Sequence, residues 1–412
     1  MSRFASTTGG SVEVRRRVRT RIGPAVSLTA VLLTGGCTGA AAPAATTSTI
    51  AAMATGGPSA LASSAASTSL AVLPAPAACP GAPRAAAPGS AQIPDALAPA
   101  GTIVKTIPAI GGPVSALVED GSVWVADHRE ATVYRIDPAT AVATRIPAEP
   151  HLYFDHGGPL VPGLGGPWFG PFLTGSNVRG WVHIDAATNT ASTPTGLRQA
   201  LESLGAGGAT GVAETADGLW AAASNVGSVD VAEFDRADGH ELRRVTIPGD
   251  ASPGRAPRIL LSAFGSLWET ADGDRVIEQI DPSSGTLIGA VALPVNPVGI
   301  VAGDHALYLA AADASVVRVD PTTDCVTAVQ FLGGAATDPV TGDGDLIAVA
   351  AGTDSVFAAY DRGALAVLDP TTLALLKAFR VDAQDFQGGV TATAGTVWYP
   401  TFGNDTVLQV KP

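Results

Sequence analysis

The sequence has little of what several large protein classes require. Of its 412 residues only 15% are charged, 5% are aromatic and three are cysteines. Beyond the N-terminal segment it has no run of about 18 apolar residues, the length that a membrane-spanning helix needs. Because 46% of the residues are nevertheless hydrophobic and the mean hydropathy is +0.28, we expect these residues to fill a packed core.

The sequence also lacks the signatures of nucleic-acid and nucleotide binding. A net charge of -13 and a pI of about 4.8 leave no basic face, which excludes a nucleic-acid partner. No GxxxxGK[ST] occurs, no GxGxxG opens a helix, and neither GxSxG nor HExxH is present. We therefore predict no cofactor. The 48 glycines and 31 prolines favour many turns over long helices.

The first 36 residues have the pattern of an export signal. Five arginines lie in residues 15–21, and a short apolar segment follows at 22–33. It ends in Leu33-Thr34-Gly35-Gly36-Cys37, which resembles the bacterial lipobox, with Thr34 where a leucine is usual. In that motif the cysteine thiol takes a diacylglyceryl group. We therefore predict a signal peptide at 1–36, a lipid anchor on Cys37 that holds the chain at the membrane, and an extracytoplasmic location. An ordinary secretory signal with a chance cysteine, and export by the twin-arginine route, are left open.

Residues 37–98 form a spacer made almost entirely of Ala, Pro, Ser, Thr and Gly. The spacer has no apolar periodicity and almost no charge, so we expect it to be disordered. With Cys37 lipidated, the remaining cysteines are Cys79 in the spacer and Cys325 in the domain that follows. In an oxidising compartment we expect these two to form a disulfide that pins the end of the spacer to the domain.

From residue 99 to the C-terminus the sequence consists of seven copies of one unit. The clearest marker is an aromatic residue after a tight turn, and successive markers are 40 to 52 residues apart. These aromatics are Trp124, Trp168, Trp220, Trp268, Tyr308, Phe357 and Trp398. The second marker is an aspartate that ends a strand in six units, often before proline, which is typical of turns. These aspartates are Asp137, Asp185, Asp235, Asp281, Asp320 and Asp369.

Each unit has the pattern of four short strands, which in the fourth unit we predict at 259–264, 267–270, 276–280 and 287–293. Seven such units predict an all-β fold, a seven-bladed β-propeller over 99–412. A β-sandwich would not need seven copies. The last unit ends after its third strand, and residues 102–108 resemble the missing fourth one. We therefore predict that the N-terminal strand closes blade 7, which removes an open sheet edge.

A family resemblance is carried by units such as Ser122-Val123-Trp124-Val125-Ala126-Asp127 and the segment 131–137 that follows. They resemble the YVTN or YncE-like repeat of a bacterial extracytoplasmic propeller family, which is adjacent to the streptogramin B lyase and NHL-repeat propellers. The resemblance covers about 310 residues and implies the propeller fold. It implies no particular activity, because one propeller scaffold carries unrelated functions.

One face of the predicted propeller collects the candidate site residues. Connections between the second and third strands of a blade lie on the same face as those between blades, and we call this the top face. Blade 1 places three of the six histidines there. The candidate residues are His128 and Arg129 in the first kind of connection and His151, Tyr153, Asp155 and His156 in the second. They could bind a ligand or a metal, or they could cap turns.

Two hypotheses of function follow. The first is a monomeric binding or scaffolding propeller that takes a protein or a small polar ligand on its top face. The second is a metal-dependent lyase or lactonase-type enzyme. Lyases of the streptogramin type repeat a Trp-Phe-Thr-Glu-like sequence and use closely spaced His and Glu. Here only Trp268-Glu269-Thr270 and Trp168-Phe169-Gly170 are similar, and no His-x-His pair occurs, so we favour the binding module.

Overall fold

The computed structural model divides the chain into two units, residues 1–62 and 63–412. The residues it describes all belong to the second unit: 69–70, 79, 101–108, 110–148, 159–173, 179–205, 207–248, 259–270, 275–332, 346–360, 363–381, 389–393 and 395–412. The predicted signal peptide and Cys37 lie outside these stretches. Within them, no helix is long and apolar enough to cross a membrane.

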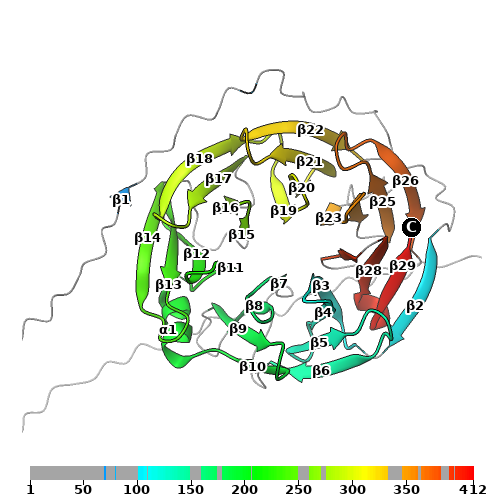
Figure 1. Cartoon of the computed structure of the whole chain (residues 1–412), viewed down its shortest axis with the longest axis horizontal. Coiled ribbons are helices and arrows are strands. Elements are labelled where there is room, and N and C mark those ends of the chain that lie inside the picture. The colour runs from blue at the N-terminus through cyan, green and yellow to red at the C-terminus, as the bar shows by residue number, and fades with distance from the viewer. Residues whose placement is uncertain are drawn as a thin grey trace, which may run out of the picture. The chain divides into compact units, whose positions relative to one another are not determined.

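Seven blades of four antiparallel strands stand in a ring, which makes the second unit a seven-bladed β-propeller (Figure 1); the sheet of blade 3 has β1 (Ser69–Leu70) as a fifth, parallel strand. From the axis outward, blade 1 contains β3 (Pro113–Glu119), β4 (Ser122–Asp127), β5 (Thr132–Ile136) and β6 (Ala143–Pro147). Blade 2 contains β7 (Leu160–Val161), β8 (Trp168–Leu173), β9 (Arg179–Asp185) and β10 (Thr190–Ser192). Blade 3 contains β11 (Gly211–Glu214), β12 (Leu219–Asn225), β13 (Ser228–Phe234) and β14 (Glu241–Pro248).

The remaining blades follow the same order. Blade 4 contains β15 (Ile259–Ala263), β16 (Ser266–Thr270), β17 (Val276–Asp281) and β18 (Thr286–Ala292), each within one residue of its predicted bounds. Blade 5 contains β19 (Pro297–Ala302), β20 (Leu307–Ala311), β21 (Ser315–Asp320) and β22 (Cys325–Phe331). Blade 6 contains β23 (Leu346–Ala351), β24 (Val356–Tyr360), β25 (Ala364–Leu368) and β26 (Leu375–Arg380). Blade 7 contains β27 (Thr391–Thr393), β28 (Thr396–Thr401), β29 (Thr406–Lys411) and β2 (Thr102–Pro108).

The seven marker aromatics lie on the second strand of each blade and are all buried. In six of the seven blades, the residue that pairs with the marker aromatic on the third strand has a polar side chain. The arginines among these side chains reach the next blade. Arg135 donates from Nη1 to the carbonyl of Ala186 in blade 2 (2.5 Å), and Arg318 donates from Nε to that of Pro370 in blade 6 (3.1 Å). The seams between blades therefore combine apolar packing with hydrogen bonds.

The six marker aspartates hold the turns between the third and fourth strands. Asp369, for example, accepts hydrogen bonds at Oδ1 from the backbone N–H groups of Thr371 (3.0 Å) and Thr372 (2.7 Å). These bonds favour the ionised carboxylate and lower the pKa of Asp369. Hydrogen bonds within the turn lower the pKa in the same way at Asp137, Asp185, Asp281 and Asp320. The predicted role of these aspartates in turns is confirmed.

The N-terminal strand closes the ring, as predicted. β2 pairs antiparallel with β29 along its whole length and is the outermost strand of blade 7 (Figure 1). Ile107 is the one buried side chain of β2. Lys105 adds a bond across the seam to blade 1, donating from Nζ to the carbonyl of Ala139 (2.8 Å). Backbone pairing therefore holds this strand more than apolar burial does.

Two points of the predicted spacer lie on the rim of the propeller. Cys79 forms a disulfide with Cys325, the first residue of β22, with the Cα atoms 5.6 Å apart, which confirms the predicted bond. Farther upstream, β1 (Ser69–Leu70) pairs in parallel with β14. The sequence did not predict this contact, because an Ala- and Ser-rich segment carries no strand pattern.

One α-helix among the described residues was not predicted. α1 (Thr195–Ser203) lies in the connection between blades 2 and 3 and has no side-chain cap. It buries Leu197 and Leu201 against Trp181, the tryptophan that stands outside the repeat register. The outer strand β10 of blade 2 has only three residues. In blade 2 the helix therefore shields apolar side chains from solvent, as a longer outer strand does in the other blades.

The outermost strands of blades 3 to 7 share a β-bulge near their start. The extra residues are Leu242, Ile288, Thr327, Leu376 and Val104. A bulge bends the strand and interrupts its row of free backbone groups, so these edges are poor templates for pairing with other chains. β1 pairs with β14 beyond the bulge, opposite Val245 and Thr246.

Candidate functional site

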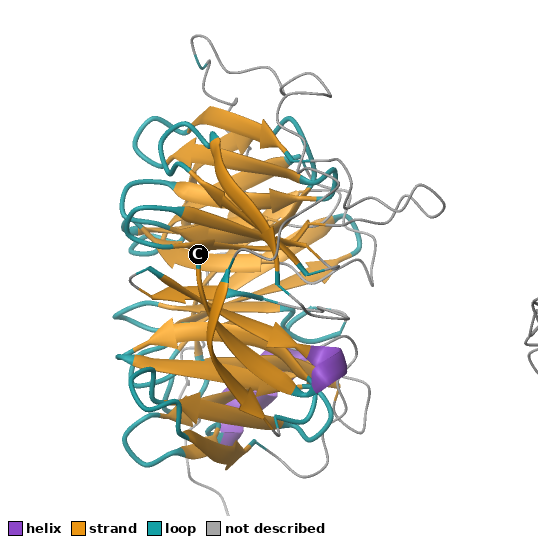
Figure 2. Ribbon diagram, turned by 90° about the vertical axis from the view of Figure 1, so that its right-hand side faces the viewer, coloured by secondary structure: helices purple, strands orange, loops and turns teal. Residues whose placement is uncertain are grey.

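The two faces of the ring differ in the length of their connections. On the bottom face, which carries the turns between first and second and between third and fourth strands, every connection has two to six residues. On the top face the connection from β22 to β23 has 14 residues, and the one from β10 to β11 contains α1. In the side view, short turns line one side of the ring (Figure 2). Binding residues concentrate in long surface connections, so this asymmetry favours the top face.

At the seam of blades 7 and 1 the top face presents a polar and aromatic group. Arg129 forms an ion pair with Asp405 of blade 7 (Nη1–Oδ1 2.6 Å), and its guanidinium lies 4.9 Å from the ring centroid of Phe402. The His128 ring meets the same phenyl ring edge-on, with centroids 5.8 Å apart. Gly112 has φ +87°, and a Cβ there would lie 3.0 Å from Cγ of Arg129, so this position suits glycine. The ion pair is nearly half exposed, which leaves both charges accessible to a ligand.

A buried carboxylate holds the connection that carries His128 and Arg129. Asp127 has no exposed surface, and its Oδ1 accepts hydrogen bonds from the backbone N–H groups of Arg129 (2.7 Å) and Glu130 (3.2 Å). Its Oδ2 has no hydrogen-bond partner among the described residues. Burial raises the pKa of Asp127, against the effect of the two backbone bonds. Asp127 thus fixes the connection that presents His128 and Arg129.

The structure places two of the six predicted top-face residues, His128 and Arg129, and both lie on that face. The other four, His151, Tyr153, Asp155 and His156, lie outside the described residues. The convergence of three histidines therefore stays a prediction. Sequence reasoning did not pair Arg129 with Asp405, which is 276 residues away. The signal that could have found this pair is the ring closure itself, which makes blades 7 and 1 neighbours.

On the bottom face two glutamates bracket the connection between β7 and β8. Glu119 of blade 1 accepts a hydrogen bond from the backbone N–H of Gly163 (2.8 Å). Glu214 of blade 3 accepts from the backbone N–H of Leu164 and from Nε1 of Trp168, both at 2.9 Å. Three blades are therefore joined through one connection. Sequence reasoning missed these glutamates because neither is part of a repeated marker.

Glu119→Gln should remove a fall in the free energy of unfolding that the parent protein shows as the pH rises. Burial raises the pKa of Glu119 to about 7, and the charges of Asp120 and Glu214 act in the same direction. The folded protein therefore binds this proton more tightly than the unfolded chain, so the stabilisation is complete below the unfolded pKa and is lost as the pH rises through about 7. A glutamine stays neutral and still accepts the bond from Gly163. At pH 8 we expect the variant to be more stable by roughly 1–2 kcal/mol, a value reduced because solvent screens the half-buried carboxyl.

Urea denaturation at about pH 4 and pH 8 measures this effect. The two proteins should be equally stable at the lower pH and differ at the higher. Glu202→Gln on α1 is the matched control, because it changes the net charge equally at a distant site. Parallel pH profiles for parent and Glu119→Gln would contradict the prediction.

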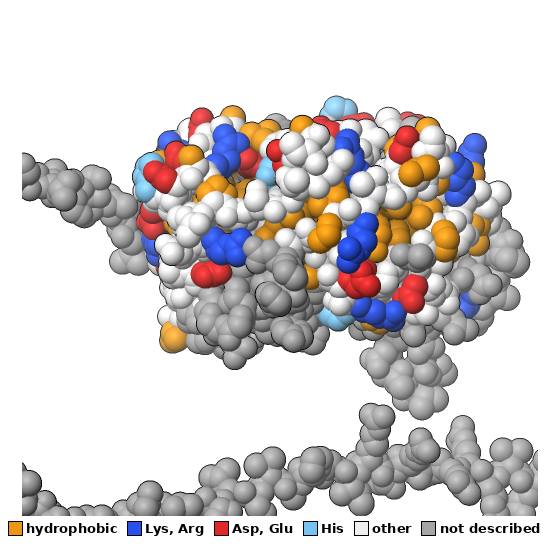
Figure 3. All heavy atoms as spheres, turned by 90° about the horizontal axis from the view of Figure 1, so that it is seen from below, with side chains coloured by type: hydrophobic (Ala, Val, Ile, Leu, Met, Phe, Trp, Pro, Cys, Tyr) orange, Lys and Arg blue, Asp and Glu red, His pale blue; other side chains and the backbone are white. Residues whose placement is uncertain are grey.

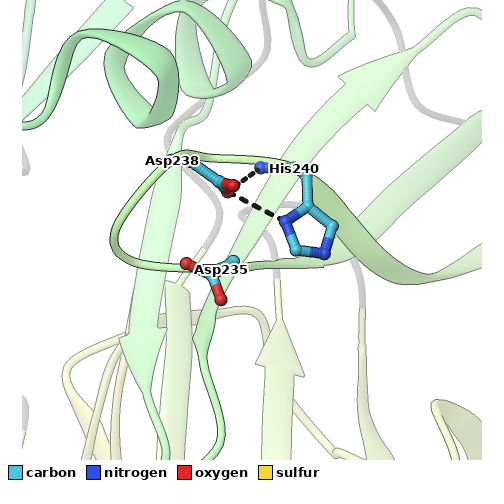
Figure 4. A group of neighbouring side chains, drawn as sticks. All are labelled: Asp235, Asp238 and His240. Carbon is cyan, nitrogen blue, oxygen red and sulfur yellow. Dashed lines mark hydrogen bonds and ion pairs between the residues drawn. The ribbon is translucent and has the colours of Figure 1, made fainter.

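One turn on the bottom face holds the only three metal-capable side chains that lie close together in the described stretches. The ligand atoms of Asp235, Asp238 and His240 lie within 4.8 Å of one another (Figure 4). Asp238 accepts hydrogen bonds from the backbone N–H of His240 (3.0 Å) and pairs with its Nδ1 (2.8 Å), and this side-chain bond raises the pKa of His240. The turn packs against the start of α1, where a Cβ on Gly196 would lie 1.9 Å from the carbonyl of Asp238. Because these side chains hold their own turn, we interpret the group as turn structure.

The rim of the ring carries charges of both signs. On the side that carries β6 and β10, acidic and basic side chains are interspersed with apolar ones (Figure 3). Arg145 of β6 and Glu130 form one exposed pair, with Nη2 and Oε2 2.9 Å apart. Exposed pairs of this kind stabilise little and mark no charged partner.

Comparisons with known proteins support the fold and leave the function open. The structure is similar to that of a streptogramin B lyase, with a TM-score of 0.54 and 17% identity over 74% of this chain and 96% of that one. It is also similar to the computationally designed Ika8 protein, with a TM-score of 0.48 and 13% identity over 73% of this chain and 97% of that one. No protein-family profile matches the chain. No curated protein matches it either. At such low identity the likeness to the lyase concerns the propeller fold alone.

Proposed function

We propose that this chain is a lipid-anchored extracytoplasmic propeller of the YVTN or YncE-like kind, which binds a protein or a small polar ligand on its top face. The observation that carries the proposal is the difference between the faces. The turns below have two to six residues, whereas above the connection from β22 to β23 has 14 residues and the one from β10 to β11, which contains α1, has 18. Catalytic and binding residues are usually carried by long connections on a rigid scaffold. We propose that the protein works as a monomer.

The described part of the top face supports ligand binding by charge and stacking. The guanidinium of Arg129 lies over the Phe402 ring and pairs with the carboxylate of Asp405, and the backbone of Arg129 is held by the buried Asp127. A guanidinium and a carboxylate side by side fit a partner that carries both charges, such as a zwitterion or a polar peptide segment. His151, Tyr153, Asp155 and His156, in the connection from blade 1 to blade 2, are the further candidate residues that the sequence predicts.

The proposed location rests on the sequence and is supported by the disulfide. Cys37 follows an arginine-rich segment and an apolar stretch, as in exported lipoproteins. The bond between Cys79 and Cys325 fits an oxidising compartment, where disulfides persist. Several acyl chains on Cys37 would hold the protein at the membrane more firmly than one chain does.

A photo-cross-linking amino acid placed in intact cells tests the proposal. We expect Val226→photo-cross-linker, in the top-face connection of blade 3, to give discrete adducts, and Val142→photo-cross-linker, on the bottom face of blade 1, to give none. Both valines are exposed, at 81% and 63%, so the pair is matched in side chain and accessibility. In the same cells, Cys37→Ser should move the protein from the membrane to the soluble fraction.

Two results would contradict the proposal. Equal adducts at the two valines would remove the preference for the top face. Unchanged membrane association of Cys37→Ser would remove the lipid anchor.

The likeness to streptogramin B lyase keeps a metal-dependent lyase or lactonase as a second candidate. Such a site needs at least three nitrogen or oxygen ligands about 2.0–2.2 Å from one point. In the stretches that the structure describes, the one group of three lies in the turn of Asp235, on the bottom face. A metal bound in stoichiometric amount by the purified protein, and lost on His128→Ala, would favour the lyase over the binding module.

A further inference from the structure

At the seam of blades 7 and 1 two of the longer connections of their kind meet on the top face. Between second and third strands, the connections that the structure describes in full have four residues in blades 1 and 7, two in blade 3 and three in blade 5. The ion pair of Arg129 and Asp405 joins the two longer ones. The connection from β2 to β3 crosses the same seam in only four residues, which include Gly111 and Gly112. Little side-chain bulk therefore separates the two connections.

The main chain holds both charged residues in place. On the side of blade 1, the backbone N–H of Arg129 donates to Oδ1 of the buried Asp127 (2.7 Å). On the side of blade 7, Asp405 has a left-handed φ of 52°, and its carbonyl accepts a hydrogen bond from the backbone N–H of Ile110 (3.2 Å). The guanidinium and the carboxylate are thus positioned before a ligand binds, which lowers the entropic cost of binding.

Phe402 is the platform on which the guanidinium lies. Its ring is partly buried and packs against the core cluster that contains Trp124 and Ala126. The guanidinium of Arg129 lies 4.9 Å from the ring centroid, within the range of a cation–π contact. Gly112 leaves room for this arrangement, because a Cβ there would lie 3.0 Å from Cγ of Arg129 and 3.1 Å from Cε2 of Phe402. The contact restricts an otherwise flexible arginine side chain.

The ion pair leaves hydrogen-bonding groups on both residues for a ligand. Among the described residues, the side chains of Arg129 and Asp405 make one hydrogen bond, which joins Nη1 to Oδ1 (2.6 Å). A guanidinium has five N–H donors, and the second carboxylate oxygen of Asp405 is a further acceptor. Both side chains are nearly half exposed. Arg129 can therefore take a carboxylate on its remaining N–H groups while Asp405 accepts a hydrogen bond from an ammonium group.

We propose that this site binds the zwitterionic head of a free α-amino acid, with the ligand carboxylate on Arg129 and the ligand ammonium group on Asp405. The inference rests on the proposed binding function of the top face and names its class of ligand. An α-amino acid carries both charged groups on one carbon atom, so both reach neighbouring protein groups at the same time. A ligand with a carboxylate alone would bring a like charge beside Asp405, and an amine alone would bring one beside Arg129.

Saturation-transfer difference NMR with three small probes tests the class of ligand on the purified full chain. Glycine carries both charged groups, acetate only the carboxylate, and glycinamide only the ammonium group. Each probe has carbon-bound protons that report transfer from the protein. We expect the dissociation constant of glycine to be about tenfold lower than that of acetate or glycinamide, because each of these lacks one charge-assisted hydrogen-bond contact.

Two variants test the assigned residues. In Arg129→Gln and in Asp405→Asn, glycine should bind about tenfold more weakly, since each variant removes one of the two charges. Arg145→Gln is the matched control, because Arg145 also forms an ion pair on blade 1 and is as exposed as Arg129, at 49% against 46%. This control should bind glycine like the parent. All three variants should melt like the parent, because exposed ion pairs contribute little to stability.

Three outcomes would overturn the inference. Acetate that binds as well as glycine, and is weakened only by Arg129→Gln, would mean that the site takes a carboxylate and not a zwitterion. No transfer from the parent protein to glycine would exclude α-amino acids as the ligand class. Equal binding of glycine by the parent and both variants would place the binding elsewhere. The proposed function would fail separately, through equal adducts at Val226 and Val142 in cells, so the two failures are distinguishable.

Discussion

Deleting residues 99–110 should lower the free energy of unfolding by several kcal/mol and make the protein aggregate. The deletion removes β2, with all its backbone pairing to β29, and two buried isoleucines, Ile107 and Ile110. Both isoleucines belong to the core that contains Trp398 and Val407 at the seam of blades 7 and 1. Burial of two such side chains and the lost hydrogen bonds amount to roughly 5 kcal/mol or more. The exposed edge of β29 would then pair with other chains.

Thermal unfolding and light scattering measure the two effects. Deletion of residues 50–61, which lie in the first unit, removes the same length of chain and is the matched control. We expect the control to melt like the parent. If the 99–110 deletion also melted like the parent, the closure of blade 7 by β2 would be wrong.

Removing the disulfide should have the second largest effect. In the double variant Cys79→Ser/Cys325→Ser, which leaves no free thiol in the domain, we expect a loss of about 2–5 kcal/mol. The reason is the long loop that the bond closes, because its ends are 246 residues apart and an unfolded chain without the bond gains much conformational freedom. The loss should appear as a lower midpoint of guanidinium denaturation.

Reduction gives the matched comparison. The parent protein in dithiothreitol should unfold at the same denaturant concentration as the double variant in oxidising buffer. A double variant as stable as the oxidised parent would contradict the prediction. Hydrogen exchange at Leu70 should rise in the double variant, because its pairing with β14 depends on the nearby bond.

Most of the fold could be predicted from the sequence repeat, because each blade packs against its neighbours through the same types of residue. Trp124, Trp220 and Trp268 recur because a large aromatic fills the space between neighbouring sheets, and all three are fully buried. Asp137 and Asp281 recur because a carboxylate satisfies the backbone N–H groups of a tight turn. Both effects are local, so they leave a pattern in one sequence.

The candidate site was predicted only in part. Loop order along the chain placed His128 and Arg129 on the top face, since topology alone assigns each connection to a face. Their contacts with Phe402 and Asp405 depend on how blade 1 meets blade 7 across the closed ring. The same holds for Glu119 and Glu214, which reach one connection from two different blades. Residues that come into contact only because the ring closes have no regular sequence spacing and belong to no common motif.

The sequence by itself determined the number of blades, the closing strand and the pairing of the cysteines. Each of these follows from a count: seven markers, one missing strand, and two cysteines besides Cys37, the predicted site of lipidation. The tertiary structure alone decided the placement of α1, the pairing of β1 with β14, and the bulges of the outer strands. These features occur where the repeated strands leave apolar side chains or a sheet edge uncovered. An example is Trp181, which the short β10 does not cover and α1 does. The burial that stabilises these features involves surfaces that exist only after the ring has formed. No local sequence pattern therefore predicts them.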